Sequence, residues 1–181
     1  MGLFATFPTD EVTVADIASA VDMTPAAVYY HFASKEQILV EGLQAFSARM
    51  LAELQNNLPS KGDRQGLRNL VGHMLTWTHR NRTPARVYFV SSIGLNLLVE
   101  ALRRENRLEM VELFRDAARA SRGRVGSAEA GVIGVALVSM FETAAASMLN
   151  QDSAFLGLGS RRFAEAVKDL ADRIAGVAPA A

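Results

Sequence analysis

The sequence predicts an all-α protein built from two parts, a small three-helix domain at residues 1–46 and a helical bundle at residues 47–181. Apolar residues recur at the spacing of one helix face along nearly the whole chain, and no segment shows the strict alternation of a half-buried strand. Three helix-start signatures occur close together before residue 40. Glycine, proline and asparagine stand at the expected breaks.

Composition excludes several classes of protein. No run reaches the roughly 18 uninterrupted apolar residues of a membrane span, because the stretch 130–149 is interrupted by Ser139 and Glu142. The amino-terminal residues carry no lysine or arginine ahead of an apolar run, so they do not resemble a secretory signal. Cysteine is absent, which excludes disulfides, thiol nucleophiles and thiolate metal sites. We expect a cytoplasmic protein with no membrane partner.

Charge is unevenly distributed although the net charge is zero. Residues 1–50 contain only Lys35 and Arg49 as bases, against six acidic residues. This acidity disfavours contact with phosphates, because nucleic-acid binding usually depends on lysine and arginine there.

The first of the three signatures predicts a short helix. Thr13 is its expected N-cap, and Asp16 stands three residues later in a capping-box relation. An apolar stripe follows at i, i+3, i+4 and i+7, formed by Val14, Ile17, Ala18 and Val21.

A second helix is predicted from Pro25 to Phe32. Thr24 is the expected N-cap, and proline suits the first helical position because its missing N–H leaves no bond unmade. Only Asp22 and Met23 are expected to separate this helix from the first, and Asp22 can adopt the left-handed conformation at modest cost. Such a closely joined pair is a helix-turn-helix.

Ser34, with Gln37 three residues later, opens the third and longest of these helices, predicted over residues 34–56 and ending before Pro59. Its apolar face consists of Ile38, Leu39, Leu43, Phe46, Met50, Leu51 and Leu54.

The run VTVADIASAVDMTPAAVYYHFASKEQIL, residues 12–39, resembles the DNA-binding segment of the TetR family of bacterial transcriptional repressors. The shared pattern is a threonine, an Ile-Ala pair, a tight turn, an aromatic run and a Ser-Lys-Glu. It covers about residues 3–46, and beyond it the resemblance is one of architecture only. The family usually has glycine where this chain has Asp22.

The resemblance implies that the helix at 25–32 enters the major groove of double-stranded operator DNA as the recognition helix. Val28 and Phe32 face inward. Positions 24–27 lie nearest the bases, where alanines offer apolar contact with thymine methyl groups and DNA shape contributes to specificity. The residues expected on the DNA side are Thr13, Thr24, Pro25, Ala26, Ala27, Tyr29, Tyr30, His31 and Lys35, with Lys35 as the main phosphate contact.

Family members open with a basic arm and a complete first helix, and "GLFATF" supplies only the last turn or two of that helix. We therefore expect either that translation starts upstream of Met1 or that the gene was shortened. Mass spectrometry of the native protein distinguishes these, because an amino terminus at Met1 contradicts an upstream start.

The regulatory part, residues 47–181, is predicted to contain helices near 64–81, 84–102, 105–121, 128–150 and 161–175, the last two capped by Ser127 and Ser160. In the family, the last two long helices pair with those of a second subunit, so we expect a homodimer. The alternative is that the helix at 128–150 is simply buried within one subunit. The candidate interface residues are Gly131, Gly134, Val138, Phe141 and Ala145.

The resemblance also implies a pocket for a small-molecule inducer between the middle helices, and ligand binding would move the long helix at 34–56. Candidate lining residues are Met74, Trp77, Thr78, Phe89, Phe114, Met140 and Glu142, each of which is also compatible with ordinary core. Glu142 stands out, since a buried carboxylate needs a partner such as an arginine or a polar ligand.

Two other classes of protein are alternatives to a DNA-binding regulator. An all-α enzyme or a metal or haem carrier is disfavoured, because His31, His73 and His79 form no metal-binding spacing and no glycine-rich phosphate loop precedes a helix. We expect no enzyme activity, no cofactor and no metal site. The other class is a TetR-like dimeric ligand-binding module that has lost DNA binding, which the acidic first fifty residues favour.

Overall fold

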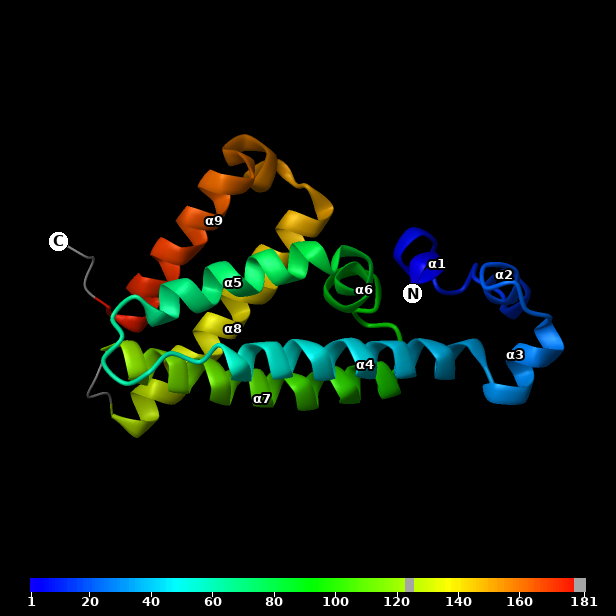
Figure 1. Ribbon diagram of the computed structural model, residues 1–181, viewed down its shortest axis with the longest axis horizontal. Coiled ribbons are helices and arrows are strands. Elements are labelled where there is room, and N and C mark those ends of the chain that lie inside the picture. The colour runs from blue at the N-terminus through cyan, green and yellow to red at the C-terminus, as the bar shows by residue number, and fades with distance from the viewer. Residues whose placement is uncertain (123–125, 178–181) are drawn as a thin grey trace.

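The computed structural model describes residues 1–122 and 126–177, and within them every regular element is helical, as predicted (Figure 1). The elements are α1 (Gly2–Thr6), α2 (Val14–Ser19), α3 (Pro25–His31), α4 (Lys35–Asn56), α5 (Gly66–Arg80), α6 (Arg82–Arg86), the π-helical turn η1 (Val87–Ser91), α7 (Leu97–Arg122), α8 (Ser127–Asn150) and α9 (Ser153–Ala175).

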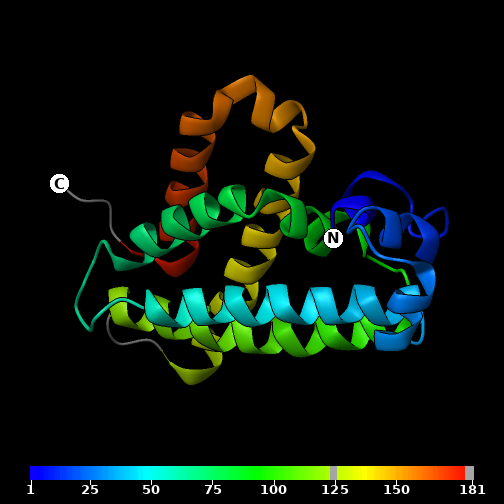
Figure 2. The same cartoon turned by 45° about the vertical axis from the view of Figure 1, so that its right-hand side comes forward.

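The molecule is elongated, with α2 and α3 at one end and the larger helical bundle at the other (Figure 1). The long helix α4 connects the two ends and lies beside α7 along most of its length, as both views show (Figure 2). On the other side of this pair, α5 packs against α9, and α8 packs against both α7 and α9. Any rearrangement of α4 against α7 therefore reaches the amino-terminal end directly.

The predicted caps of the first three helices are confirmed. Thr13 and Asp16 form a complete capping box on α2, and the side chains of Thr24 and Ser34 accept hydrogen bonds from backbone N–H groups at the starts of α3 and α4. Val21, predicted to extend the apolar stripe of α2, is 56% exposed. The prediction is wrong because α2 ends at Ser19, two residues before Val21.

The predicted break between helices at 102 and 105 is also wrong, because α7 runs through it without interruption. Arginine and glutamate favour a helix, so the run RRENR does not interrupt one. The chain breaks earlier, at Gly94, whose φ of +72° belongs to the left-handed region that favours glycine. Asn96 then caps α7, its Oδ1 accepting a hydrogen bond from the Val99 N–H at 2.9 Å.

The last helix begins earlier than predicted. Asp152, not Ser160, is its cap, with Oδ1 accepting from the N–H groups of Ala154 and Phe155. Gly159, at φ +72° and ψ 160°, interrupts the helix immediately before Ser160, which explains the misleading signal. Ser127 is the first residue of α8 rather than its cap. The predicted break before α8 lies partly outside the described residues.

A single apolar core extends from α1 to α9. Its centre is aromatic: the Phe46 ring lies 5.5 Å from both Trp77 and Tyr88, and Phe141 lies 5.9 Å from Phe89 and 5.8 Å from Phe114. These contacts join α4 to helices of the bundle, so α4 is part of the apolar core of the bundle as well as the connection to the amino-terminal end.

Helix α8 is long and apolar enough to cross a membrane by length and composition alone. Half of its most apolar window is buried inside the molecule, against neighbouring helices. The core helix of a folded bundle has the same composition.

Candidate DNA-binding interface

The turn between α2 and α3 has the geometry expected of a helix-turn-helix. Asp22 adopts φ +53°, in the left-handed region, as predicted for the position where glycine is usual. The Met23 N–H donates to the Ala18 carbonyl at 2.9 Å and closes the turn. Ala18 is fully buried and Val28 nearly so, and they hold the two short helices together.

The outer face of α3 is exposed and rich in aromatic groups. Tyr30 is 85% exposed and Tyr29 57%, and the Tyr30 ring meets His31 edge-on with centroids 5.1 Å apart. Pro25 and Ala26 are exposed at the start of the helix. Neighbouring exposed aromatic side chains can form a contact surface for a partner, and tyrosine hydroxyl groups can donate to phosphate.

The two threonines predicted to face DNA use their hydroxyl groups as caps. Thr24 Oγ1 accepts from the Ala27 N–H at 3.2 Å. Thr13 Oγ1 accepts from the Asp16 N–H at 3.1 Å and donates to Asp16 Oδ2 at 2.6 Å. The hydroxyl of Thr13, followed by its backbone N–H, lowers the pKa of the Asp16 carboxyl, which stays ionised beside the start of α2.

Lys35, which was expected to contact phosphate, instead binds main-chain carbonyl groups. Its Nζ donates to the main-chain carbonyls of Thr9 and Val12, both at 2.8 Å, and of Asp10 at 3.2 Å. An ammonium has three N–H donors, and three are engaged here. Lys35 therefore fastens the chain between α1 and α2 to the start of α4, and its ammonium has no N–H left for a phosphate in this arrangement.

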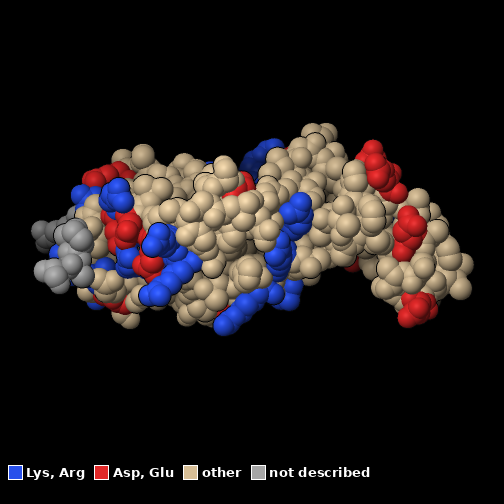
Figure 3. Space-filling view, turned by 90° about the horizontal axis from the view of Figure 1, so that it is seen from above, with Lys and Arg blue, Asp and Glu red and all other residues tan. Residues whose placement is uncertain are grey.

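The start of α4 also carries a negative charge. Hydrogen bonds from the Glu36 backbone N–H and the Ser34 hydroxyl lower the pKa of the Glu36 carboxyl, so the carboxylate occupies the end of the helix dipole that would attract phosphate. Figure 3 shows acidic side chains at the end of the molecule formed by α2 and α3, and the lysines and arginines in that view lie over the rest of the molecule.

Sequence reasoning missed two exposed apolar residues of this surface. Val21 and Met23, at 56% and 40% exposure, stand in the turn beside the start of α3. Five residues, 20–24, separate α2 from α3, rather than only Asp22 and Met23 as predicted, so Val21 and Met23 both lie outside the helices. The predicted inward residue Phe32 is half-buried and ends α3 in an extended conformation.

Most of the residues predicted to line an inducer pocket lie in the apolar core. Met74, Thr78, Phe89, Phe114 and Met140 are buried, and Trp77 is half-buried against Phe46. The Thr78 hydroxyl oxygen is buried without a hydrogen-bond partner among the described residues.

Glu142 lies apart from them and pairs with Arg107 of α7. The sequence predicted that Glu142 would need either an arginine or a polar ligand as its partner, and the structure shows the arginine. The pair opens onto a surface hollow of about 280 Å³ that Arg103, Arg104 and Glu100 also line.

Four of the five candidate dimer residues are buried within the subunit. Gly134 is buried against α7, where a Cβ atom would stand 2.6 Å from the Val111 carbonyl oxygen. Val138, Phe141 and Ala145 have no exposed surface. Gly134 thus allows α8 to pack closely against α7 within one subunit, which agrees with the alternative stated for this helix.

One comparison with known proteins identifies the amino-terminal domain. Residues 1–42 match the family model described as "Bacterial regulatory proteins, tetR family". No curated protein and no solved structure matches the chain. The match spans the helix-turn-helix and the start of α4, the segment that carries the turn geometry and the exposed aromatic face described above. Residues 1–42 therefore form a domain of the tetR family of bacterial regulatory proteins, and this match supports a regulator of transcription.

Proposed function

We propose that the protein is a ligand-responsive transcriptional repressor that binds operator DNA as a homodimer and is released by a small molecule. The observation that supports DNA binding best is the exposed aromatic face of α3, where Tyr30 projects with 85% of its surface free. The family match, which points to a regulator rather than an enzyme, agrees with this.

The chemistry of that face favours apolar and hydrogen-bonded contacts over charge. Ala26 can meet thymine methyl groups, and the Tyr29 and Tyr30 hydroxyls and His31 can reach phosphates. With Lys35 fastened to carbonyl groups, the interface contributes few cations. We expect a DNA affinity whose dependence on salt is shallower than that of a lysine-rich domain.

A homodimer would use the outer face of α8 rather than the buried small residues. Val132 and Val135 on this face are 70% and 49% exposed, and Leu108 on the adjoining helix α7 is 66% exposed. Apolar side chains exposed together on two packed helices favour burial against a second copy. A dimer also supplies the two recognition helices that a palindromic operator requires.

An internal ligand site would involve Thr78. Its hydroxyl is buried without a partner, at a cost that a polar ligand group could remove. Thr78 lies on α5 near the aromatic contacts between Trp77 and Phe46 of α4, so a ligand there would act on the helix that leads to the DNA-binding end.

A second candidate function is a dimeric ligand-binding module without DNA binding. It is favoured by the occupied Lys35 ammonium and by Glu36 at the start of α4, which together leave the surface near α3 acidic. Both candidates share the bundle and differ only at the amino-terminal end.

Fluorescence anisotropy with the gene's own upstream intergenic DNA, at low and moderate salt, separates the two. Tyr30→Ala removes both the ring contact and the hydroxyl and should weaken binding by about tenfold or more, whereas Tyr30→Phe removes only the hydroxyl and should lose less. Leu97→Ala, an exposed change on α7, is the control and should bind as the unchanged chain does. Absence of binding at low salt would favour the module without DNA binding.

A further inference from the structure

Arg86, the last residue of α6, lies where the amino-terminal end of the molecule meets the bundle, and its side chain is half-buried. Its Nε donates a hydrogen bond to the main-chain carbonyl of Ala5 at 3.2 Å. Its Nη1 donates to the main-chain carbonyl of Leu149 at 2.9 Å. Ala5 belongs to α1 and Leu149 to α8, so one side chain of α6 connects these two helices.

Both carbonyl groups lie in the last turn of their helices. Ala5 is the next-to-last residue of α1, and Leu149 is the next-to-last residue of α8. The last four carbonyl groups of an α-helix have no N–H partner within the helix, and the end of a long helix such as α8 also carries a partial negative charge. A guanidinium supplies both the missing donors and a permanent positive charge. Arg86 therefore caps the ends of two helices at once.

The shape of the guanidinium restricts how the two helix ends are arranged. The group is planar, and its N–H bonds point in fixed directions. Because Nε and Nη1 are different corners of this plane, the carbonyls of Ala5 and Leu149 are held at a defined relative position. A lysine ammonium, with its charge at one point and its donors free to rotate, would not impose the same arrangement.

The contacts around Arg86 also connect α1 to the aromatic core. Helix α1 packs against α6 and η1, and α6 lies beside α1 in both ribbon views (Figures 1 and 2). The π-helical turn η1 begins directly after Arg86, and its Tyr88 and Phe89 rings lie 5.5 and 6.3 Å from the ring of Phe46 on α4. A displacement of α6 or η1 would therefore reach α1 through Arg86.

We propose that Arg86 is a positioning residue for DNA binding, which holds α1 to the end of α8 and so fixes the orientation of the helix-turn-helix against the bundle. The segment after α1 is in turn fastened to α4 by Lys35, so the place of α1 also determines that of α2. This role rests on the proposed function, because orientation matters only where two recognition helices must meet one operator. The clamp itself is measured without DNA.

The clamp is tested by electron paramagnetic resonance distance measurements within one chain. The sequence contains no cysteine, so Ser19→Cys on α2 and Ala166→Cys on α9, both at exposed positions, can carry the only two spin labels. Labelled chains are diluted into an excess of unlabelled chain, so that only distances within a chain are recorded. We expect a narrow distance distribution with Arg86 in place, and one at least about twice as broad for Arg86→Met.

Two further variants separate positioning from stability. Arg82→Met removes an exposed arginine from the other end of α6 and should leave the distribution unchanged. Arg86→Lys keeps the charge but not the planar group, so it should give an intermediate width, and it decides the test if Arg86→Met does not fold. A residue that only stabilised the fold would lower the thermal midpoint and leave a distribution recorded well below that midpoint unchanged.

DNA binding is measured separately, by anisotropy with the upstream intergenic DNA. If Arg86→Met occupies the binding orientation for about a tenth of the time, its affinity should fall about tenfold. A broadened distribution in a chain that binds no DNA would support the clamp and count against the proposed function alone. The proposal is overturned if Arg86→Met leaves the distribution narrow, if Arg82→Met broadens it equally, or if Arg86→Met broadens it without weakening the DNA binding of the unchanged chain.

Discussion

The Nζ atom of Lys35 donates to the main-chain carbonyl of Val12 at 2.8 Å, across 23 residues of sequence. Together with the carbonyls of Thr9 and Asp10, this contact fixes the segment between α1 and α2 against the first turn of α4. The lysine that the sequence pattern assigns to phosphate thus contributes first to the shape of the domain.

Replacing Lys35 by methionine should lower the free energy of unfolding by about 1–2 kcal/mol, because three carbonyl groups lose a charged donor. Urea unfolding measures the change. Lys61→Met is the matched control, since Lys61 is exposed, and it should have little effect. Equal effects of the two substitutions would show that the carbonyl contacts of Lys35 contribute nothing to stability.

Two glycines of α8 should respond to alanine in opposite directions. At Gly134 the added Cβ would meet the Val111 carbonyl oxygen at 2.6 Å, so Gly134→Ala should destabilise the protein as α8 is pushed from α7. At Gly131 nothing lies within 4 Å of the new atom, so Gly131→Ala should stabilise by up to about 1 kcal/mol through helix propensity. Thermal unfolding of both variants tests this, and effects of the same sign would contradict the packing described.

Arg68 on α5 contacts three carboxylates of α9, with N–O distances of 2.8 Å to Glu165, 2.5 Å to Asp169 and 3.1 Å to Asp172. The hydrogen bond to Asp169 contributes most to raising the pKa of Arg68 still further above its usual value. Arg68→Met should reduce stability by about 1–2 kcal/mol, and by less in 1 M salt, because salt screens partly exposed ion pairs. A loss independent of salt would instead indicate that packing of the arginine stem is responsible.

The N-cap of α9 should make part of the stability depend on pH. The Ser147 hydroxyl, then the N–H groups of Phe155 and Ala154, lower the pKa of Asp152. A carboxyl whose folded pKa is depressed stabilises the protein above its unfolded pKa of about 3.9, and that contribution is lost as pH falls through the folded value.

The thermal midpoint of Asp152→Ala should therefore lie below that of the unchanged chain at neutral pH, and the difference should shrink on acidification below about pH 4. Asp152→Asn retains a capping oxygen and should show a smaller loss at neutral pH. A gap between Asp152→Ala and the unchanged chain that stays constant with pH would exclude the ionised carboxylate as its source.

The outer face of α8 gives a test of assembly. Val132→Glu places a charge on the exposed apolar surface proposed for the homodimer, and light scattering after gel filtration should then report a monomer. Leu97→Glu, at a side chain that is 89% exposed at the start of α7, should leave the mass unchanged. If both variants keep the mass of the unchanged chain, the dimer proposal for this face is wrong.

The sequence by itself determined the features that depend on interactions between residues close together in the chain. The caps at Thr13, Thr24 and Ser34 act within one helical turn, and the apolar stripe of α4 follows from helical periodicity, so these elements appear where they were predicted. The left-handed turn at Asp22 is likewise a property of a few neighbouring residues.

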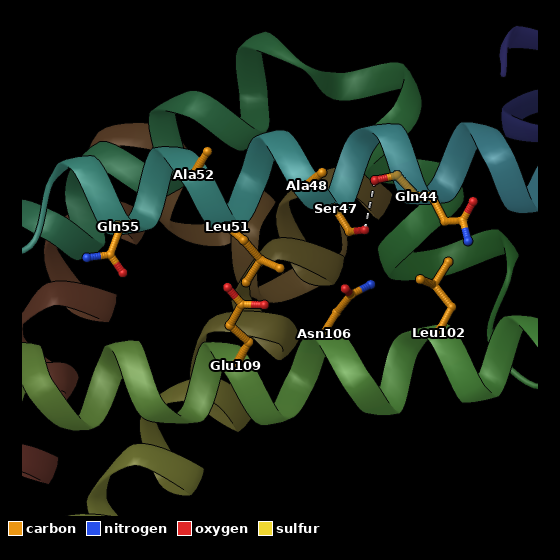
Figure 4. Close-up of a pocket in the computed structure, with 9 residues that line it drawn as sticks. All are labelled: Gln44, Ser47, Ala48, Leu51, Ala52, Gln55, Leu102, Asn106 and Glu109. Atoms are coloured by element: carbon orange, nitrogen blue, oxygen red, sulfur yellow. Dashed lines mark hydrogen bonds between the residues drawn. The ribbon is translucent and has the colours of Figure 1, made fainter.

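Only the tertiary structure decided which partner each side chain meets. Lys35 bonds carbonyl groups more than twenty residues away, Glu142 pairs with Arg107 on another helix, and Gly134 faces α7 rather than a second subunit. Periodicity identifies the apolar side of a helix but not the surface that covers it. A surface groove between α4 and α7, lined by Ser47, Ala48 and Ala52 of α4, was missed for the same reason, because it exists only where these small side chains stand opposite α7 (Figure 4).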